Sequence, residues 1–228
     1  MMSIESKNYQ WAKDLALEQG AILFGVADVS NIRSGFLLSH EEVESIQFGI
    51  SIAVPISPAV LLGIHDGPTL LYKWHYRQAN NFLDKIAFLL TTRIIEKGFY
   101  AIPIPASQIV DYSQKRGHLS HRQIAVMAGL GWRGKNNLVV HPQWGPAFRL
   151  VTILTNFPLV TDSPIQDGCG DCQVCIEKCP ASALGETPEA YRLDACYALL
   201  DRFSKERKLG VHICGICVKA CYFRKNKF

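Results

Sequence analysis

The spacing of eight cysteines constrains this 228-residue chain more than any other feature of its sequence. They form a run of four, a single cysteine and a run of three: Cys169, Cys172, Cys175 and Cys179; Cys196; Cys214, Cys217 and Cys221. A chain of this length buries enough core to fold without disulfides. The N-terminus lacks the basic and apolar segments of an export signal, so we expect a cytoplasmic protein, where clustered cysteines favour metal ligands over disulfides.

The first run has the spacing of bacterial ferredoxins, in which three thiolates hold one iron–sulfur cube and the fourth ligates a second cube. Two-residue gaps aim successive sulfurs at one cube, and a three-residue gap turns the next sulfur away. We therefore predict two 4Fe-4S clusters, with Cys196 in place of the first cysteine of a second run. The first cluster would take Cys169, Cys172, Cys175 and Cys221, and the second Cys179, Cys196, Cys214 and Cys217.

Zinc and disulfides are the alternatives for these cysteines. Zinc prefers two Cys-x2-Cys pairs per tetrahedral site, which a continuous run of four cysteines fits poorly. Residues 202–228 carry eight Lys or Arg and one acid, in a chain with 24 basic and 20 acidic residues. We interpret this basic bias as compensation for the negative charge of the clusters, which argues against a nucleic-acid-binding tail.

The cysteine-free part of the chain alternates between helical and strand patterns. We predict a helix in the first segment, with apolar residues at helical spacing over 11–16 and an end at Gly20, further helices over 70–97 and 118–128, and strands at 21–26, 49–54, 100–104, 138–140 and 148–154. The long helix would turn these side chains to the core: Trp74, Phe82, Ile86, Leu89, Leu90 and Ile94. The fold class is therefore α/β (α+β), with a body over 1–160 and a cysteine-rich module over 161–228.

A membrane span is not expected from this sequence. The uncharged segment 45–64 contains two prolines and alternates in part like a strand, so we interpret it as a buried strand and a loop.

A glycine-rich motif runs from Gly129 through Gly131 and Trp132 to Lys135. It follows a predicted helix and precedes a predicted strand, whereas a dinucleotide-binding fingerprint follows a strand and opens a helix. The glycines would let the backbone approach a large ligand, and Lys135 would meet its anionic groups.

This motif, the β-rich segment ending at Thr155 and the cysteine run with Cys196 between its halves together resemble epoxyqueuosine reductases. They resemble respiratory reductive dehalogenases more distantly. The resemblance covers about residues 73–221. It implies a nitroreductase-like, cobalamin-binding domain beside a ferredoxin-like two-cluster module that reduces the cobalt. It also implies corrinoid contacts from Ser107, Gly129, Gly131, Trp132 and Lys135.

The proton donor is harder to assign from the resemblance. Counted back from Gly129, the position of the family's proton-donating aspartate is Lys115 here, and the nearest acid is Asp111. We take Asp111, Tyr112 and His118 as candidate catalytic residues. His121 lies three residues after His118, so the two would face the same side of a helix.

The resemblance therefore implies a cobalamin- and iron–sulfur-dependent oxidoreductase. Its partners would be a low-potential electron donor such as ferredoxin or flavodoxin, and a small-molecule or corrinoid-protein substrate. Two alternatives remain open: a ferredoxin-like electron-transfer protein that reduces the corrinoid of another protein, and a flavin-binding reductase.

Overall fold

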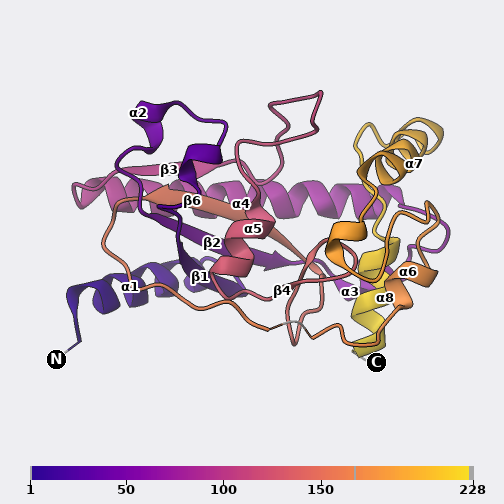
Figure 1. The fold of residues 1–228 in the computed structure, drawn as a ribbon, viewed down its shortest axis with the longest axis horizontal. Helices are drawn as coiled ribbons and strands as arrows, with labels where there is room; N and C mark the ends of the chain where they lie inside the picture. Colours follow the sequence, from indigo (N-terminus) through magenta and orange to yellow (C-terminus); the bar gives the residue numbers. More distant parts are fainter. Residues whose placement is uncertain (1, 167, 226–228) are drawn as a thin grey trace. The chain divides into compact units, whose positions relative to one another are not determined.

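The structure is a computed structural model that describes residues 2–166 and 168–225, so the last three residues of the basic segment lie outside it. Figure 1 labels the elements along the chain. The helices are α1 (Ile4–Glu18), α2 (His40–Val43), α3 (Pro58–Leu62), α4 (Leu70–Glu96), α5 (His121–Met127), α6 (Val174–Glu177), α7 (Leu193–Glu206) and α8 (Ile216–Lys225), with 3-10 turns η1 (Arg33–Gly35) and η2 (Pro188–Ala190). The strands are β1 (Leu23–Asp28), β2 (Phe48–Pro55), β3 (Ala101–Ile104), β4 (Trp132–Arg133), β5 (Val139–Val140) and β6 (Phe148–Thr155). The predicted α/β class is confirmed.

The described residues divide into two compact units, each assembled from distant segments. The body unit comprises Met1–Val54, Asn80–Leu130 and Arg149–Ile165. The cysteine unit comprises Pro55–Ala79, Gly131–Phe148 and Gln166–Phe228. The predicted division into 1–160 and 161–228 rests on composition rather than on compactness, and it stays a prediction.

A four-stranded sheet in the order β1-β2-β6-β3 forms the centre of the body unit. β1 pairs antiparallel with β2, and β3 pairs antiparallel with β6. The inner strands β2 and β6 are buried along almost their whole length, which is typical of strands covered on both faces.

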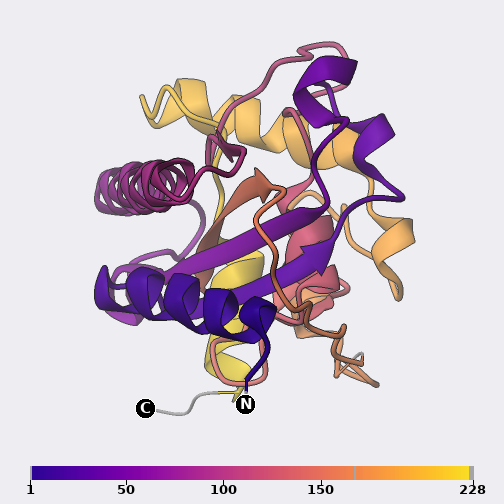
Figure 2. The same ribbon diagram turned by 90° about the vertical axis from the view of Figure 1, so that its left-hand side faces the viewer.

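Helices α1 and α5 cover opposite faces of this sheet. The Phe24 ring on β1 packs edge-on against Tyr9 of α1, at 5.4 Å between ring centroids. The next residue, Gly25, faces α5 so closely that an added Cβ would lie 2.1 Å from the Ala128 carbonyl oxygen. Successive strand residues point to opposite faces, so the two helices sandwich β1, and Figure 2 shows α1 in front of the strands.

The long helix predicted at 70–97 is confirmed as α4, but its core-facing side was predicted only in part. Ile86, Leu90 and Ile94 are buried as expected, whereas Trp74 and Phe82 are 58% and 43% exposed. Apolar side chains on a long helix continue past the arc that its neighbours cover, so periodicity alone overestimated the buried face.

The helix predicted at 118–128 begins later than expected, at His121. The Ser120 side chain accepts a hydrogen bond from the Gln123 backbone N–H, so Ser120 is the N-cap and His118 lies in the preceding loop. The five predicted strands agree with β1, β2, β3, β5 and β6 to within about two residues at each end. Helices α7 and α8 of the cysteine unit were not predicted.

In the cysteine unit, α8 packs against both α6 and α3. The Lys219 ammonium on α8 donates to the carbonyl oxygens of Leu62 and Ile64 at 2.9 and 2.6 Å. These carbonyls lie at the end of α3, where backbone acceptors lack helical partners and a lysine can satisfy them. No helix among the described residues is long and apolar enough to cross a membrane.

Candidate functional site

The eight cysteines lie on short helices and on the loops next to them. Cys175 is on α6, Cys196 on α7, and Cys217 and Cys221 are on α8, one turn apart on the same face. The other four cysteines lie in loops: Cys169, Cys172, Cys179 and Cys214. All eight thiols are free, so the disulfide alternative finds no pairing in this structure.

The thiols of Cys169, Cys172 and Cys175 form one electrostatic group. The pKa of Cys175 is raised to about 11, mainly by burial and further by the neighbouring thiols of Cys169 and Cys172. Positive charge placed among these sulfurs would reverse the effect, because a metal centre stabilises the thiolate.

A second group surrounds Cys217. Burial raises the pKa of Cys217 well above its ordinary value, and neighbouring thiols add to the rise: Cys214, Cys175, Cys179 and Cys196. Burial likewise raises the pKa of Cys214 to about 11, with smaller contributions from Cys196 and Cys179. Three of these neighbours and Cys217 itself are the four cysteines that spacing assigned to the second cluster, and Cys175 is the contact with the first group.

Across the part of the chain that the structure describes, no three His, Cys, Asp or Glu side chains converge closely enough to hold a single metal ion. Sulfurs around a four-iron cube lie further apart than sulfurs around one ion, so the described cysteines are too widely spaced for a single ion but not for a cube.

The glycine-rich motif lies against the first thiol group. The Trp132 indole N–H donates to Cys169 Sγ at 3.3 Å. The Lys135 ammonium is 2.8 Å from Glu186 Oε2, and only 8% of the Lys135 residue is exposed. Glu186 raises the pKa of Lys135, with further contributions from Cys169 and Cys172. No sequence pattern pointed to Glu186, which lies in an irregular stretch after the first cysteine run.

The motif's glycines have a structural reason that the sequence did not reveal. Gly129 and Gly131 have φ values of +70° and +155°. An added Cβ would lie 2.7 Å from the Ser163 carbonyl oxygen at Gly129 and 2.3 Å from the Val140 carbonyl oxygen at Gly131. The close approach that requires glycine is therefore to the chain's own backbone.

The loop between β3 and α5 contains the candidate proton donors. Asp111 accepts hydrogen bonds from the Gln114 and Ser113 backbone N–H groups and from the Ser113 hydroxyl, at 2.7 to 3.0 Å. These bonds hold the pKa of the exposed Asp111 carboxyl below its usual range, and the bond from the Gln114 backbone contributes most. The carboxylate therefore stabilises the turn in its ionised form.

The other candidates in this loop are more accessible. Tyr112 is 81% exposed, and Ser107 is exposed as well. His118 Nδ1 lies 3.0 Å from the Leu37 carbonyl oxygen. A carbonyl only accepts, so Nδ1 carries the proton and Nε2 is the atom that can exchange one.

His121 has a structural role that differs from that of His118. Its Nε2 is 2.9 Å from the Pro105 carbonyl oxygen, and its Nδ1 is 2.8 Å from Thr152 Oγ1. Nε2 therefore donates to Pro105, and in the neutral ring Nδ1 accepts from the Thr152 hydroxyl. Burial lowers the pKa of His121 to about 4, so the ring is neutral and fixed between β6 and the end of β3.

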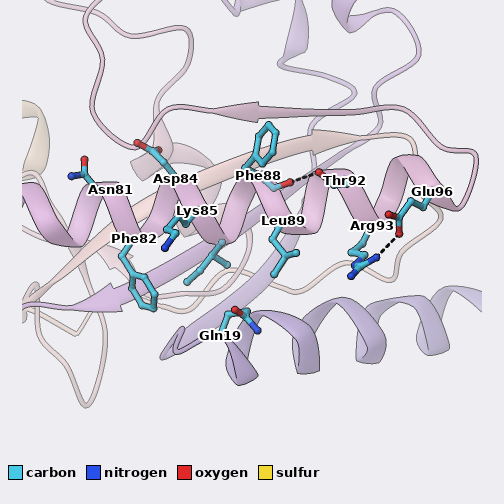
Figure 3. Close-up of a pocket in the computed structure, with 11 residues that line it drawn as sticks. Gln19, Asn81, Phe82, Asp84, Lys85, Phe88, Leu89, Thr92, Arg93 and Glu96 are labelled. Atoms are coloured by element: carbon cyan, nitrogen blue, oxygen red, sulfur yellow. Dashed lines mark hydrogen bonds and ion pairs between the residues drawn. The ribbon is translucent and has the colours of Figure 1, made fainter.

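A pocket of about 880 Å³ lies on the body unit, between the end of α1 and helix α4. Figure 3 shows Phe82, Leu89 and Arg93 of α4 pointing toward Gln19 at the end of α1. None of the candidate cofactor or catalytic residues lines this pocket.

Comparison with known proteins identifies relatives. No protein-family model matches the chain. An epoxyqueuosine reductase from Listeria monocytogenes serovar 1/2a is 34% identical over 155 residues, which cover 65% of this chain and 38% of that protein. This chain therefore matches well under half of the relative's length.

Two solved structures share the fold. An epoxyqueuosine reductase in complex with a tRNA-Tyr epoxyqueuosine-modified stem loop has a TM-score of 0.66 at 20% identity, over 96% of this chain and 65% of that one. The other is a reductive dehalogenase whose structure suggests a mechanism for B12-dependent dehalogenation. It has a TM-score of 0.78 at 17% identity, over 100% of this chain and 33% of that one. The chain is therefore related to the epoxyqueuosine reductases, in a fold that it shares with reductive dehalogenases.

Proposed function

We propose that this protein is a reductase in which two 4Fe-4S clusters of the cysteine unit deliver electrons to a corrinoid in the body. The first cluster takes Cys169, Cys172, Cys175 and Cys221, and the second takes Cys179, Cys196, Cys214 and Cys217. The observation that carries the proposal is the grouping of the thiols, because Cys214, Cys179 and Cys196 all act on Cys217, and Cys175 links this group to the first one. The similarity to an epoxyqueuosine reductase supports a reaction in which the substrate is reduced.

The cysteine unit fits iron–sulfur clusters in its donor set. Seven of the eight thiols fall into two groups by their electrostatic neighbours, and Cys221 follows Cys217 by one turn of α8. Lys135 supplies a positive charge beside the first group, and this charge would stabilise the more negative, reduced state of a cluster. Glu186 holds the lysine in place.

The candidate residues offer a corrinoid polar groups of suitable chemistry. Ser107 has an exposed hydroxyl for the amide side chains of such a cofactor, whereas the Trp132 N–H and the Lys135 ammonium already bind Cys169 and Glu186 and would be shared with it. Gly129 and Gly131 would contribute through the shape of their loop. A bound corrinoid would supply reductive chemistry at cobalt, as in the dehalogenase that is described as B12-dependent.

Proton delivery to the substrate would come from the loop between β3 and α5. Asp111, Tyr112 and His118 are the proposed donors. The hydrogen bonds that lower the pKa of Asp111 favour its ionised form, so His118, with Nε2 available to exchange a proton, is the first to test.

For partners, we propose a cytoplasmic low-potential donor such as ferredoxin or flavodoxin, and a small-molecule or corrinoid-protein substrate. The complex of a related reductase with a tRNA stem loop adds a modified tRNA base to the substrates that need testing. Binding of such a stem loop by this chain would correct our expectation that its partners are not nucleic acids.

The test is anaerobic purification followed by titration with cobalamin. We expect a broad absorption that dithionite bleaches, stoichiometric binding of cobalamin, and reduction of its cobalt when the clusters are reduced. The matched variant Cys196→Ala should bind cobalamin normally but reduce it more slowly, because it lacks one ligand of the second cluster.

Two results would redirect the proposal. Protein with full clusters that binds no corrinoid but reduces a corrinoid protein would be an electron-transfer partner. Protein that retains a flavin instead would be a flavin reductase. In the assay with substrate, His118→Gln that leaves turnover unchanged would remove His118 as the proton donor.

A further inference from the structure

The segment from Trp132 to Asn136 covers the thiol of Cys169. The Trp132 indole N–H donates to Cys169 Sγ at 3.3 Å. An added Cβ at Gly134 would lie 3.6 Å from the same sulfur, and one at Gly168 would lie 2.8 Å from the Trp132 ring. The indole of Trp132 and the backbone of Gly134 therefore both lie against this sulfur.

Within this segment, Asn136 has a buried donor that no described group accepts. Its Oδ1 accepts from the Leu138 backbone N–H at 3.1 Å. Its Nδ2 is buried and has no hydrogen-bond partner among the described residues, and the whole residue is 4% exposed. A buried N–H without an acceptor costs about 1–3 kcal/mol, so a donor in this position indicates an acceptor that the protein chain does not supply.

The Asn136 side chain and the Cys169 thiol flank the same glycine. The position of a Cβ at Gly134 is 2.9 Å from Asn136 Oδ1 and 3.6 Å from Cys169 Sγ, so both side chains approach the backbone at this residue. Sulfur in an iron–sulfur cluster carries negative charge and accepts N–H hydrogen bonds, whether it is sulfide or cysteine sulfur.

We propose that the Asn136 side-chain amide donates a hydrogen bond to a sulfur of the cluster held by Cys169, beside the bond from Trp132, and so raises the reduction potential of that cluster. This inference rests on the proposed function, since it requires the cluster. Reduction adds one electron to the cluster and takes its core from 2+ to 1+, with no bond broken. The two N–H donors stabilise the added negative charge, so the reduced state becomes easier to reach.

The test is a redox titration of anaerobically purified protein, with dithionite as reductant and the two clusters followed by their EPR signals. In Asn136→Leu, which has a similar volume and no donor, we expect one of the two potentials to shift to a more negative value while the other stays. Trp132→Phe should shift the same cluster. Full clusters with both potentials unchanged in Asn136→Leu, or with both shifted equally, would overturn the assignment.

Matched controls separate this effect from general disturbance. Asn81→Leu on the exposed face of α4 and Trp74→Phe, at a ring 58% exposed, should leave both potentials unchanged. If the wild-type protein assembles no cluster at all, the proposed function fails; if it assembles both and only the shift is missing, this inference alone fails.

A measurement on the wild-type protein covers the case in which Asn136→Leu does not fold. Protein labelled with ¹⁵N in asparagine side chains, reduced with dithionite, should show a weak ¹⁵N hyperfine coupling in the EPR spectrum of one cluster. Absence of that coupling, in a sample where indole-¹⁵N tryptophan gives the coupling expected from Trp132, would also overturn the proposal.

Discussion

One histidine of the body unit is held at both ring nitrogens. Pro105 offers only an acceptor, so His121 Nε2 must donate there, and the neutral ring accepts at Nδ1 from Thr152. The Thr152 hydroxyl could also accept from a charged ring, so it is burial that disfavours the charged form. The pattern of two histidines three residues apart suggested equivalent residues, but only His118 keeps a nitrogen that can exchange a proton.

The neutral state of His121 makes stability depend on pH. The pKa of about 4 in the folded protein lies below the ordinary value of 6.5, so the unfolded chain binds the proton first as pH falls. The stabilisation that comes from the neutral His121 is therefore fully present above pH 6.5 and is lost as pH falls toward 4. From pH 7 to pH 5 we expect a loss of about 2 kcal/mol in the free energy of unfolding.

Urea unfolding of wild type and His121→Gln at both pH values checks this expectation. Glutamine keeps a donor and an acceptor but does not titrate, so the variant should lose less stability between pH 7 and pH 5 by about the same 2 kcal/mol. An identical pH dependence in the two proteins would contradict the neutral assignment of the half-buried His121.

At the scale of elements, close contact between β1 and α5 requires a residue without a side chain. The position of a Cβ at Gly25 is 2.1 Å from the Ala128 carbonyl oxygen and 2.6 Å from Leu130 Cδ1. A backbone carbonyl cannot rotate away as a side chain does, so the helix or the strand would have to shift.

We therefore expect Gly25→Ala to lower the free energy of unfolding by about 1–3 kcal/mol, the usual cost of overpacking. Gly35→Ala is the matched control, since a Cβ there meets nothing within 4 Å. The measurement is urea unfolding at pH 7. Equal stability of the two variants would show that β1 and α5 are not packed this closely.

The same scale shows what the sequence could and could not predict. Helix α4 and strands β2 and β6 carry long apolar patterns, and their predicted positions are confirmed. The start of α5 was wrong because Ser120 is its cap and the apolar pattern does not mark a cap. Helices α7 and α8 were not predicted, because their cysteines were interpreted as cluster ligands in loops and interrupt the helical pattern. Glu186 and Asn136 gave no signal, because their roles arise from contacts across the fold.

At the scale of the whole chain, each compact unit combines segments that are distant in sequence. The body unit has a covered sheet as its core, whereas much of the cysteine unit is loops and helices that carry the eight cysteines, most of them half-buried. Bound clusters would thus contribute far more to the stability of the cysteine unit than to that of the body unit.

Removal of the clusters should accordingly loosen one unit selectively. After anaerobic chelation, we expect amide hydrogen exchange to rise strongly in peptides from residues 168–225 and little in peptides from β1 and β2. The strands serve as the internal control in the same sample. A uniform rise across the chain would indicate that the two units unfold together.

The most direct measurement of the central claim is the iron and acid-labile sulfide content of anaerobically purified protein. Two 4Fe-4S clusters predict about eight iron atoms and eight sulfides per chain, falling to about half of each in Cys196→Ala. Stoichiometric zinc without acid-labile sulfide, or about four iron atoms in wild type and in Cys196→Ala alike, would contradict the account.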